Sequence, residues 1–540
     1  MRSPVRNLRS DHAGTPRHFG PQCLMTLALT LPLLGGYSHA STPTASNDSN
    51  VSIRTATSQI TGLRHDQVSS YRGIPYAQPP VGALRWQPPL EVTPAGKIDA
   101  TKFGADCSQR SPYPESLGNG NSEDCLYLNV WAPNDIKKPL PVIVFIHGGG
   151  FEYGSGALPM YDGSKLAAQG ALVVTLNYRL GIFGFLAHPE LDAESPRHVS
   201  GNYGILDQIM ALGWIKKNIR SFGGDPGRVT LMGQSAGSRA ISMLMTSPQA
   251  YDLFHQVILQ SGPGLRHVTT LSEAEGASSS LGSIASLRSM SAEQLLAISE
   301  QKKAADEGLL EPVWARPVVD GWVIPRQQFE SLNSGTFKAV PMLLGTNANE
   351  GGAYGAKLAS KRAADFDRSL FENFADKAGP LSEVYGAGTS SDVGTAYAKL
   401  WTDMEFNVPG NWLSKASAQR QPLTFRYLFA QKRGDVDTLP IHGAELQYVF
   451  NTLDTPHKGK KPLTSASDRA LSAHIQAAWV AFATTGNPGI GAAVTWPAYG
   501  QGQKCMALDT PRKVTACPDV SRVENILTTR PAGQASAAAN

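Results

Sequence analysis

The chain has little cysteine, no long block of charge of one sign and no internal repeat. Only five of its 540 residues are cysteines, and metal-ligand spacing of cysteine and histidine is absent, so no metal is expected. The 48 lysines and arginines nearly balance the 44 acidic residues, which excludes the basic surface that nucleic acid or an anionic membrane would need. Hydrophobic residues make up 41% of the chain, enough for a large buried core.

An apolar run over residues 24–34 lies between four arginines and the sequence Ser38-His39-Ala40. A basic region, a short apolar core and a small-residue cleavage site indicate a secretory signal, and the run is too short to span a membrane. Cys23 lacks the small-residue context of a lipoprotein acceptor. We therefore expect a signal peptide over residues 1–40, a single domain over residues 41–540, and a secreted or periplasmic protein without a membrane anchor.

Residues 233–237, Gly-Gln-Ser-Ala-Gly, lie between an apolar run at 228–232 and a helix-compatible stretch at 238–245. A strand that turns within a few residues into a helix can hold a serine on a strained turn, with its hydroxyl exposed above the helix N–H groups. Glycines two residues before and after the serine let the strand and the helix approach closely. Ser235 is therefore a candidate nucleophile, and the alternative is a glycine-serine turn with no chemical role.

A serine nucleophile needs a histidine base and a carboxylate that orients this base. Glu350 follows a short apolar run that begins at residue 341, and His442 follows another strand-like run at residues 423–429. By itself, Glu350 could be a surface carboxylate and His442 a structural histidine. The order serine, acid, histidine and the positions beyond the ends of predicted strands favour a triad with Ser235.

The developing oxyanion needs hydrogen-bond donors, which an upstream glycine run can supply. Residues 140–146 are almost all apolar, as expected of a strand covered on both faces, and they lead into His147 and three glycines at 148–150. Glycines leave backbone N–H groups unshielded, so we assign the oxyanion hole to Gly149, Gly150 and Ala236. The alternative is a phosphate-binding loop, but no G-K-[ST] or G-x-G-x-x-G pattern accompanies this run.

Further segments of the chain, in addition to the candidate catalytic residues, carry recognisable sequence motifs. They are Tyr71–Ala77, Pro79-Pro80, Gly82 and Leu84-Arg85-Trp86; Glu123–Val130; Asn177-Tyr178-Arg179 with Gly181, Gly184 and Phe185; Gly201-Asn202 with Asp207 and Gln208; Phe222–Pro226; Gln260-Ser261-Gly262; and Phe482-Ala483 with Thr485–Pro488. With them, the chain resembles the type B carboxylesterase family over about residues 50 to 500. The resemblance implies an α/β-hydrolase fold, with a mostly parallel central sheet flanked by helices on both faces.

The resemblance also implies roles for individual residues. It supports the assignments made above for Ser235, Glu350, His442, Gly149, Gly150 and Ala236. It adds Ser261 and Glu445 as a supporting polar network behind the histidine, where buried polar groups must satisfy one another. Of the cysteines beyond the signal, Cys107, Cys125, Cys505 and Cys517 allow three pairings in an exported protein. Pairing of cysteines that are close in the sequence, together with the disulfide-closed loop that the resemblance to the family implies, favours Cys107–Cys125 and Cys505–Cys517.

The chain departs from the family pattern at three places. Where most members read G-x-S-A-G-G, this chain has Gly237-Ser238-Arg239, which places a cation one helical turn after the nucleophile, and Asn349 precedes the acid where an aspartate is common. The loop between Cys107 and Cys125 contains Tyr113 but no tryptophan, so the aromatic platform that holds choline in cholinesterases is missing and choline esters are not expected as substrates. Arg239 is either a helix residue with a solvated head or a guanidinium that binds a carboxylate of the substrate's acyl group.

These residues predict a serine hydrolase that cleaves small-molecule carboxylic esters through an acyl-enzyme and needs no cofactor. A carboxylate-binding Arg239 would favour an anionic acyl group, and the resemblance to the family, which includes esterases that release polyanionic tricarballylate side chains from a long amino-alcohol backbone, implies such esters as candidate substrates. The alternative is a generalist esterase for short-chain or aromatic esters. A non-catalytic binding protein of the neuroligin kind is a further alternative, although such proteins usually lose the serine or the histidine that this chain keeps.

Overall fold

The computed structural model describes residues 49–92, 96–265, 267–304, 314–433, 438–456, 462, 464–489 and 495–527, and every statement below refers to them. The predicted signal peptide over residues 1–40 and Cys23 lie outside the described residues. Within the described residues, no helix has the length and apolar character needed to cross a membrane.

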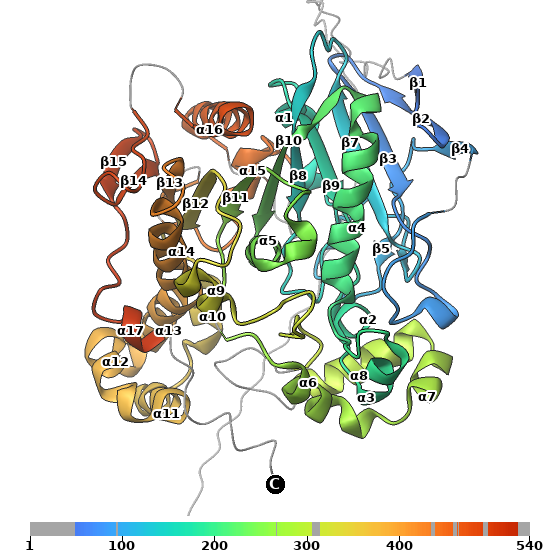
Figure 1. The fold of residues 1–540 in the computed structure, drawn as a ribbon. Coiled ribbons are helices and arrows are strands. Elements are labelled where there is room, and N and C mark those ends of the chain that lie inside the picture. The colour runs from blue at the N-terminus through green and yellow to red at the C-terminus, as the bar shows by residue number, and fades with distance from the viewer. Residues whose placement is uncertain are drawn as a thin grey trace, which may run out of the picture. The chain divides into compact units, whose positions relative to one another are not determined.

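A mixed, mainly parallel sheet forms the centre of the fold (Figure 1). Its parallel strands lie side by side in the order β9 (Leu172–Leu176), β8 (Leu140–Ile146), β10 (Gly224–Gln234), β11 (Gln256–Gln260), β12 (Met342–Asn347), β13 (Thr424–Phe429) and β14 (Lys504–Leu508). Antiparallel strands extend it at both edges: β7 (Tyr127–Pro133), β3 (Val68–Pro75), β2 (Ser58–Arg64) and β1 (Ser49–Arg54) beside β9, and β15 (Lys513–Ala516) beside β14. The predicted α/β-hydrolase fold is confirmed.

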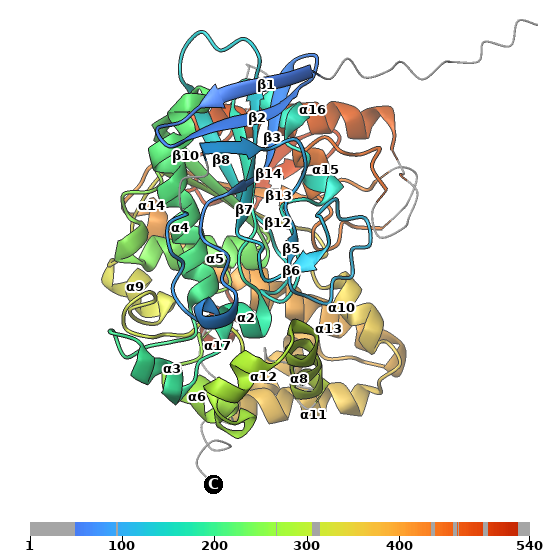
Figure 2. The same cartoon turned by 90° about the vertical axis from the view of Figure 1, so that its right-hand side faces the viewer.

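Both faces of the sheet are covered by helices, as the apolar sequence of β8 predicts. Val142, Val144 and Ile146 face one hydrophobic core, whereas Ile143 and Phe145 face another, because successive side chains of a strand point in opposite directions. The first core includes residues of α4 (Tyr203–Asn218), α5 (Ala236–Thr246), α9 (Gln328–Ser334) and α14 (Val408–Ala418). The second includes residues of α1 (Ser164–Ala167), α15 (Leu446–Val449) and α16 (Ala466–Thr485). Figure 2 shows α4, α9 and α14 on one side of the sheet and α15 and α16 on the other.

Two groups of helices with small cores of their own lie at the lower end of the view in Figure 1. One comprises α10 (Gly352–Leu358), α11 (Ala363–Phe374), α12 (Ala378–Tyr385), α13 (Val393–Thr402), the π-helical turn η8 (Asp403–Asn407) and α17 (Glu524–Leu527). The other comprises α2 (Gly181–Phe185), α3 (Pro189–Glu194), α6 (Leu271–Ser278), α7 (Ile284–Ser289) and α8 (Ala292–Ala304). The first group forms one wall of the site described below.

Two disulfide bonds are present, and they join the cysteines that were expected to pair. Cys107–Cys125 closes a loop before β7, and Cys505–Cys517 links β14 to the residue after β15. Such bonds are typical of proteins that reside in an oxidising compartment.

Candidate functional site

Ser235 lies on the sharp turn between β10 and α5. Its backbone has a φ of 57° and a ψ of −125°, a conformation that residues other than glycine rarely adopt. The Ser235 N–H donates to the Gln260 carbonyl at 3.0 Å. The two flanking glycines are needed for this turn. A β-carbon on Gly233 would lie 2.6 Å from the backbone of Gly237, and one on Gly237 would collide with the carbonyl of Ile146. The strand and the helix therefore approach closely, and the serine side chain remains at the surface of a cavity.

Glu350 and His442 meet although they are 92 residues apart. The His442 Nδ1 atom lies 2.7 Å from the Glu350 Oε2 atom, and the Glu350 side chain is fully buried. The Asn347 N–H donates to the other carboxylate oxygen at 2.7 Å, which fixes the acid at the end of β12. The Asn349 N–H donates to the Pro440 carbonyl at 3.0 Å, so the loops that carry the acid and the histidine are joined by backbone. The carboxylate can therefore orient the imidazole and favour a proton on Nδ1.

Seven of the predicted site residues line one cavity with a volume of about 340 Å³. Gly150, Ser235, Ala236, Arg239, Ser261 and His442 form what we call the sheet wall, and Glu350 lies behind His442. Gly149 and Glu445 are not among the lining residues. The structure therefore gathers residues that follow five strands of the sheet, together with the first turn of α5, around one space.

The loop at residues 147–150 follows β8 in a conformation that requires glycine, and we call it the oxyanion loop after the role expected of Gly149 and Gly150. Gly149 and Gly150 have φ values of 110° and 62°, and a β-carbon on Gly149 would collide with the carbonyl of Tyr153. His147 anchors the start of the loop: its Nδ1 lies 2.8 Å from the Gly148 carbonyl, and its ring stacks on Tyr178 with centroids 4.5 Å apart. Complete burial lowers the pKa of His147 to about 4, so its ring is neutral at ordinary pH. It therefore adds no charge beside the loop.

The polar network behind the histidine differs in its members from the expected one. Glu445 accepts hydrogen bonds from the Asn347 side chain at 2.6 Å and from the Gln260 side chain at 3.3 Å. The hydroxyl of Ser261 has no hydrogen-bond partner in the part of the chain that the structure describes. Burial, and then the nearby charge of Glu350, raise the pKa of Glu445 to about 7. Asn347 and Gln260 thus supply the contacts expected of Ser261. Gln260 stands in the motif Gln260-Ser261-Gly262, but the motif did not indicate that its side chain contacts Glu445.

Arg239 faces the cavity rather than bulk solvent alone. It is half-buried, and a β-carbon on Gly264 would lie 2.8 Å from its Cδ atom and 3.3 Å from its Nε atom. Both Arg239 and Gly264 line the cavity that contains Ser235. The side chain is therefore positioned to meet a bound molecule.

The cavity is also lined by residues that the motifs did not identify. Tyr354, Lys357, Trp401, Glu405 and Phe406, from α10, α13 and η8, form what we call the helical wall. Tyr354 and Trp401 stack with ring centroids 4.3 Å apart, and Phe406 lies 5.0 Å from the ring of His442. A mostly aromatic wall suits an apolar part of a ligand.

Gln234, the residue before the nucleophile, was also not singled out. Its Nε2 atom lies 3.2 Å from His442 Nε2. A β-carbon added to Gly443 would lie 3.8 Å from this Nε2 atom, and one added to Gly148 would lie 2.8 Å from the Gln234 Oε1 atom. The side chain therefore bridges the oxyanion loop and the histidine loop.

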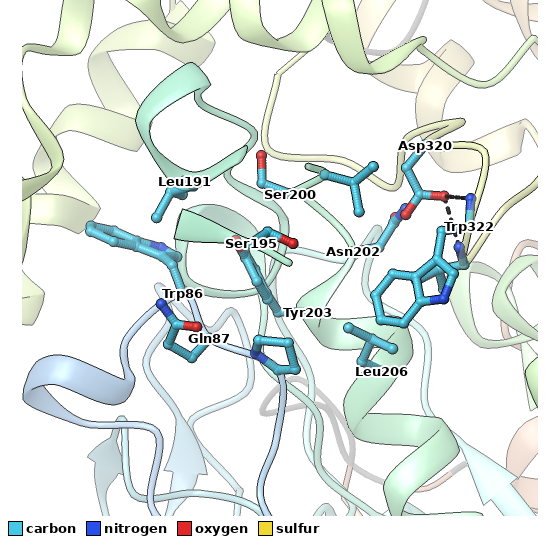
Figure 3. Close-up of a pocket in the computed structure, with 13 residues that line it drawn as sticks. Trp86, Gln87, Leu191, Ser195, Ser200, Asn202, Tyr203, Leu206, Asp320 and Trp322 are labelled. Atoms are coloured by element: carbon cyan, nitrogen blue, oxygen red, sulfur yellow. Dashed lines mark hydrogen bonds between the residues drawn. The ribbon is translucent and has the colours of Figure 1, made fainter. Parts of the chain in front are cut away.

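The described residues contain no group of three or more histidine, cysteine or acidic side chains that could hold a metal ion. A second pocket, lined by Trp86, Tyr203 and Trp322 among others, shares no lining residue with the cavity around Ser235 (Figure 3). Its volume of about 20 Å³ has room for a water molecule but not for an ester. The cavity around Ser235 is therefore the better candidate for a substrate site.

Comparison with known proteins agrees with this geometry. The profile of the Carboxylesterase family matches residues 49–528. The chain is 41% identical to "Fumonisin B1 esterase" of Sphingopyxis macrogoltabida, over 84% of this chain and 85% of the relative, and 35% identical to "Para-nitrobenzyl esterase" of Bacillus subtilis (strain 168), over 83% and 92%. A solved structure of a thermophilic PNB esterase superimposes with a TM-score of 0.77 at 34% identity, covering 88% of this chain and 99% of that chain. The chain belongs to the carboxylesterase family and is a carboxylic ester hydrolase.

Proposed function

We propose that Ser235, His442 and Glu350 hydrolyse esters through a covalent acyl-enzyme. The Ser235 hydroxyl attacks the ester carbonyl carbon while His442 accepts its proton, and Glu350 stabilises the imidazolium that forms. The carbonyl oxygen becomes an oxyanion that the N–H groups of Gly149, Gly150 and Ala236 bind. His442 then donates its proton to the leaving alcohol. In the second half of the reaction, His442 takes a proton from a water molecule that attacks the acyl carbon, the bond to Ser235 Oγ breaks, and His442 returns the proton to Oγ as the acid leaves.

One observation carries this proposal: the hydrogen-bonded pair His442–Glu350 opens onto the same cavity as the strained Ser235. The Nε2 atom of the buried Gln234 side chain lies 3.2 Å from the second ring nitrogen of His442. Hydrogen bonds of a catalytic triad often tighten only when substrate binds, so this contact is compatible with proton transfer from Ser235.

Covalent labelling tests the mechanism directly. A fluorophosphonate reacts with an activated serine, so peptide mapping of the labelled protein should find the adduct on Ser235. The variant His442→Ala should not be labelled at a comparable rate, because its serine has no base. Labelling of another serine in the wild-type protein would contradict the proposed mechanism.

We further propose that the acyl group of the substrate carries free carboxylates, as in tricarballylate esters of fumonisin type. Arg239 lies in the cavity wall beside Gly264, and Lys357 is an exposed cation on the helical wall. A relative that shares 41% identity bears the name "Fumonisin B1 esterase". Arg239 and Lys357 line the cavity together with the carboxylates of Glu350 and Glu405, and Glu350 is engaged by His442. The two cations can pair with an anionic acyl group, and the stacked Tyr354 and Trp401 offer a flat surface to an alkyl chain.

A panel of esters separates this substrate from the alternative of a generalist esterase. It should contain neutral short-chain, long-chain, aromatic and tricarballylate esters of matched leaving alcohols. The proposal expects the highest kcat/KM for the tricarballylate ester. A preference for neutral short-chain or aromatic esters would favour the generalist.

We also propose that the protein is exported after removal of residues 1–40. The two disulfide bonds support an oxidising compartment. N-terminal sequencing of the protein recovered from the culture medium or the periplasm should begin close to Ser41. Recovery of the full-length chain from the cytoplasm, with free thiols at Cys107 and Cys125, would contradict export.

A further inference from the structure

A buried arginine lies behind the oxyanion loop. The Arg316 side chain is only 12% exposed, and its Nη2 atom donates to Glu152 Oε1 at 2.7 Å. Its Nη1 atom is buried and has no hydrogen-bond partner among the residues that the structure describes. An unsatisfied nitrogen on a buried cation destabilises a fold, which raises the question of what else this nitrogen faces.

The Nη1 atom faces the backbone of Gly150. A β-carbon on Gly150 would lie 3.6 Å from Nη1. Gly150 lines the cavity together with Ser235, whereas Glu152 is not among the residues that line it. The Nη1 end of the guanidinium therefore lies beside Gly150.

Both partners of this ion pair are held by rigid backbone. The Glu152 N–H donates to the Gly149 carbonyl at 3.0 Å, which makes the oxyanion loop a closed turn. Two residues after Arg316, Val318 donates to the Asn202 side chain at 3.0 Å and accepts from it at 2.8 Å. Figure 3 shows Asn202 beside Asp320 of the same segment, whose carboxylate accepts backbone N–H groups. The guanidinium therefore has little freedom to move away from Gly150.

We propose that Arg316 is a positioning residue of the oxyanion hole, which places positive charge beside Gly150 while the Glu152 side chain accepts a hydrogen bond from its guanidinium. This inference rests on the proposed role of Gly150 as an oxyanion donor. Full negative charge develops on the substrate oxygen only as the tetrahedral adduct forms, so a nearby cation stabilises the transition state more than the bound ester. Arg316 should therefore act on kcat rather than on KM.

The test compares variants of the full-length enzyme on an uncharged ester, 4-nitrophenyl butyrate, to avoid any direct contact between the cation and a substrate carboxylate. Arg316→Met should lower kcat about 10- to 100-fold, less than the loss of a direct oxyanion donor, with KM within about twofold of wild type. The inhibition constant of a trifluoromethyl ketone, which forms a charged tetrahedral adduct with a serine, should rise by the same factor. Arg316→Lys, which keeps the charge but not the planar fork, should regain part of kcat.

Two further variants serve as controls. Glu152→Gln keeps an oxygen acceptor for Arg316 but removes the compensating negative charge, so kcat should remain within about threefold of wild type. Arg197→Met removes an exposed arginine that lies over the ring of Trp322 in the same region, and it should leave kcat unchanged. Melting temperatures establish whether each variant is folded. If Arg316→Met does not fold, the kinetics of Arg316→Lys and Glu152→Gln are enough to test the inference.

The inference is overturned if Arg316→Met or Arg316→Lys changes KM alone, or if kcat changes without a parallel change in ketone binding. It is also overturned if Glu152→Gln lowers kcat as much as Arg316→Met, because the effect then comes from the ion pair and not from the charge beside Gly150. Failure of the proposed function is distinguishable, since the fluorophosphonate would then not label Ser235 in the wild-type enzyme. Normal labelling of Ser235 combined with wild-type kinetics of the Arg316 variants would reject this inference alone.

Discussion

The two walls of the cavity differ in how they are built. In the sheet wall, Ser235 and His442 follow strands of the central core, and hydrogen bonds between neighbouring elements fix their backbones. In the helical wall, Tyr354, Trp401 and Phe406 lie on helices and on a π-helical turn that pack around a separate small core. The reactive groups thus lie on the sheet wall, while the helical wall presents mostly aromatic surface and one exposed cation, Lys357.

This difference suggests a division of labour between chemistry and substrate selection. Bond cleavage needs groups held to within a fraction of an ångström, which a sheet edge provides. Selection of the substrate depends on shape and charge that can change without disturbing the core, which a separate helical layer permits. Substitutions of Ser235, His442 or the glycine loop should therefore lower kcat for every ester, and substitutions in the helical wall should change the ranking of esters.

The largest effect is expected from loss of the nucleophile or the base. Ser235→Ala and His442→Ala should each lower ester hydrolysis by roughly 10⁴- to 10⁶-fold, because the two residues act as a unit. Both variants should still bind the intact ester with wild-type affinity, since the helical wall is unchanged. Stopped assays of hydrolysis, together with calorimetric titration of the ester into Ser235→Ala, measure the two quantities. Substantial turnover by purified Ser235→Ala would refute the mechanism.

The next effect compares two buried carboxylic acids of the same region. Glu350→Gln should lower kcat by about 10⁴-fold, because the histidine loses its orienting charge. Glu445→Gln is the matched control, since Glu445 contacts Asn347 and Gln260 rather than the imidazole, and it should change kcat only a few-fold. Steady-state kinetics on one neutral ester give both values. The reverse order of effects would identify Glu445 as the orienting acid.

The sheet wall could be predicted from the sequence because its residues are local to strand ends. Ser235 and Gly150 directly follow apolar runs that could only be buried strands, and glycines mark where the backbone must turn sharply. Glu350 and His442 needed the additional knowledge of chain order in this fold. The expected disulfide pairing followed from the short loops together with the family pattern.

The helical wall and Arg316 could not be predicted in this way. Which helix covers the cavity depends on tertiary packing, and the periodicity of α10 or α13 contains no information about Ser235. Glu405 and Phe406 lie on a π-helical turn, which has no simple sequence signature. Arg316 and Glu152 are 164 residues apart, and neither stands in a motif. The Ser261 expectation shows the same limit, because the motif identified the position but not its hydrogen-bond partners.

Arg239 lies at the border between the walls and should affect selection through the acyl group. Arg239→Ala should lower kcat/KM for an ester with a free acyl carboxylate about 10- to 150-fold more than for a neutral ester of similar size. This ratio is what the loss of one charge-assisted hydrogen bond at a partly buried site is expected to cause. Arg239→Lys should recover part of the loss, because lysine lacks the planar fork. Equal losses on both esters would mean that Arg239 supports α5 and does not bind the substrate.

Lys357 should give a smaller, salt-dependent effect because it is exposed. Lys357→Gln should lower kcat/KM for a tricarballylate ester about two- to fivefold at low ionic strength and much less at about 0.5 M salt. Lys361→Gln, an exposed lysine four residues later that does not line the cavity, is the matched control and should have no effect. A loss that persists at high salt, or that Lys361→Gln reproduces, would contradict a role of the helical wall in selecting charged esters.

The last prediction concerns the stability of Glu445 variants rather than their activity. It tests what it costs to bury a charge behind the sheet wall. The pKa of Glu445 is raised from its ordinary value of 4.5 to about 7, mainly by burial and then by Glu350. Between these two pH values the folded protein binds more protons than the unfolded chain, so the free energy of unfolding should fall as the pH rises through this window and level off above it.

Glu445→Gln removes this titration and should therefore show a flatter dependence of melting temperature on pH between about 4.5 and 7.5 than the wild type. Glu91→Gln, at an exposed carboxylate that pairs with Lys217, should keep the wild-type slope. The difference between wild type and Glu445→Gln should be largest above pH 7, where the wild-type carboxylate is charged while buried. Parallel curves for wild type and Glu445→Gln would show that the protein does not hold this carboxyl in its neutral form, and the sheet wall would then tolerate two buried charges side by side.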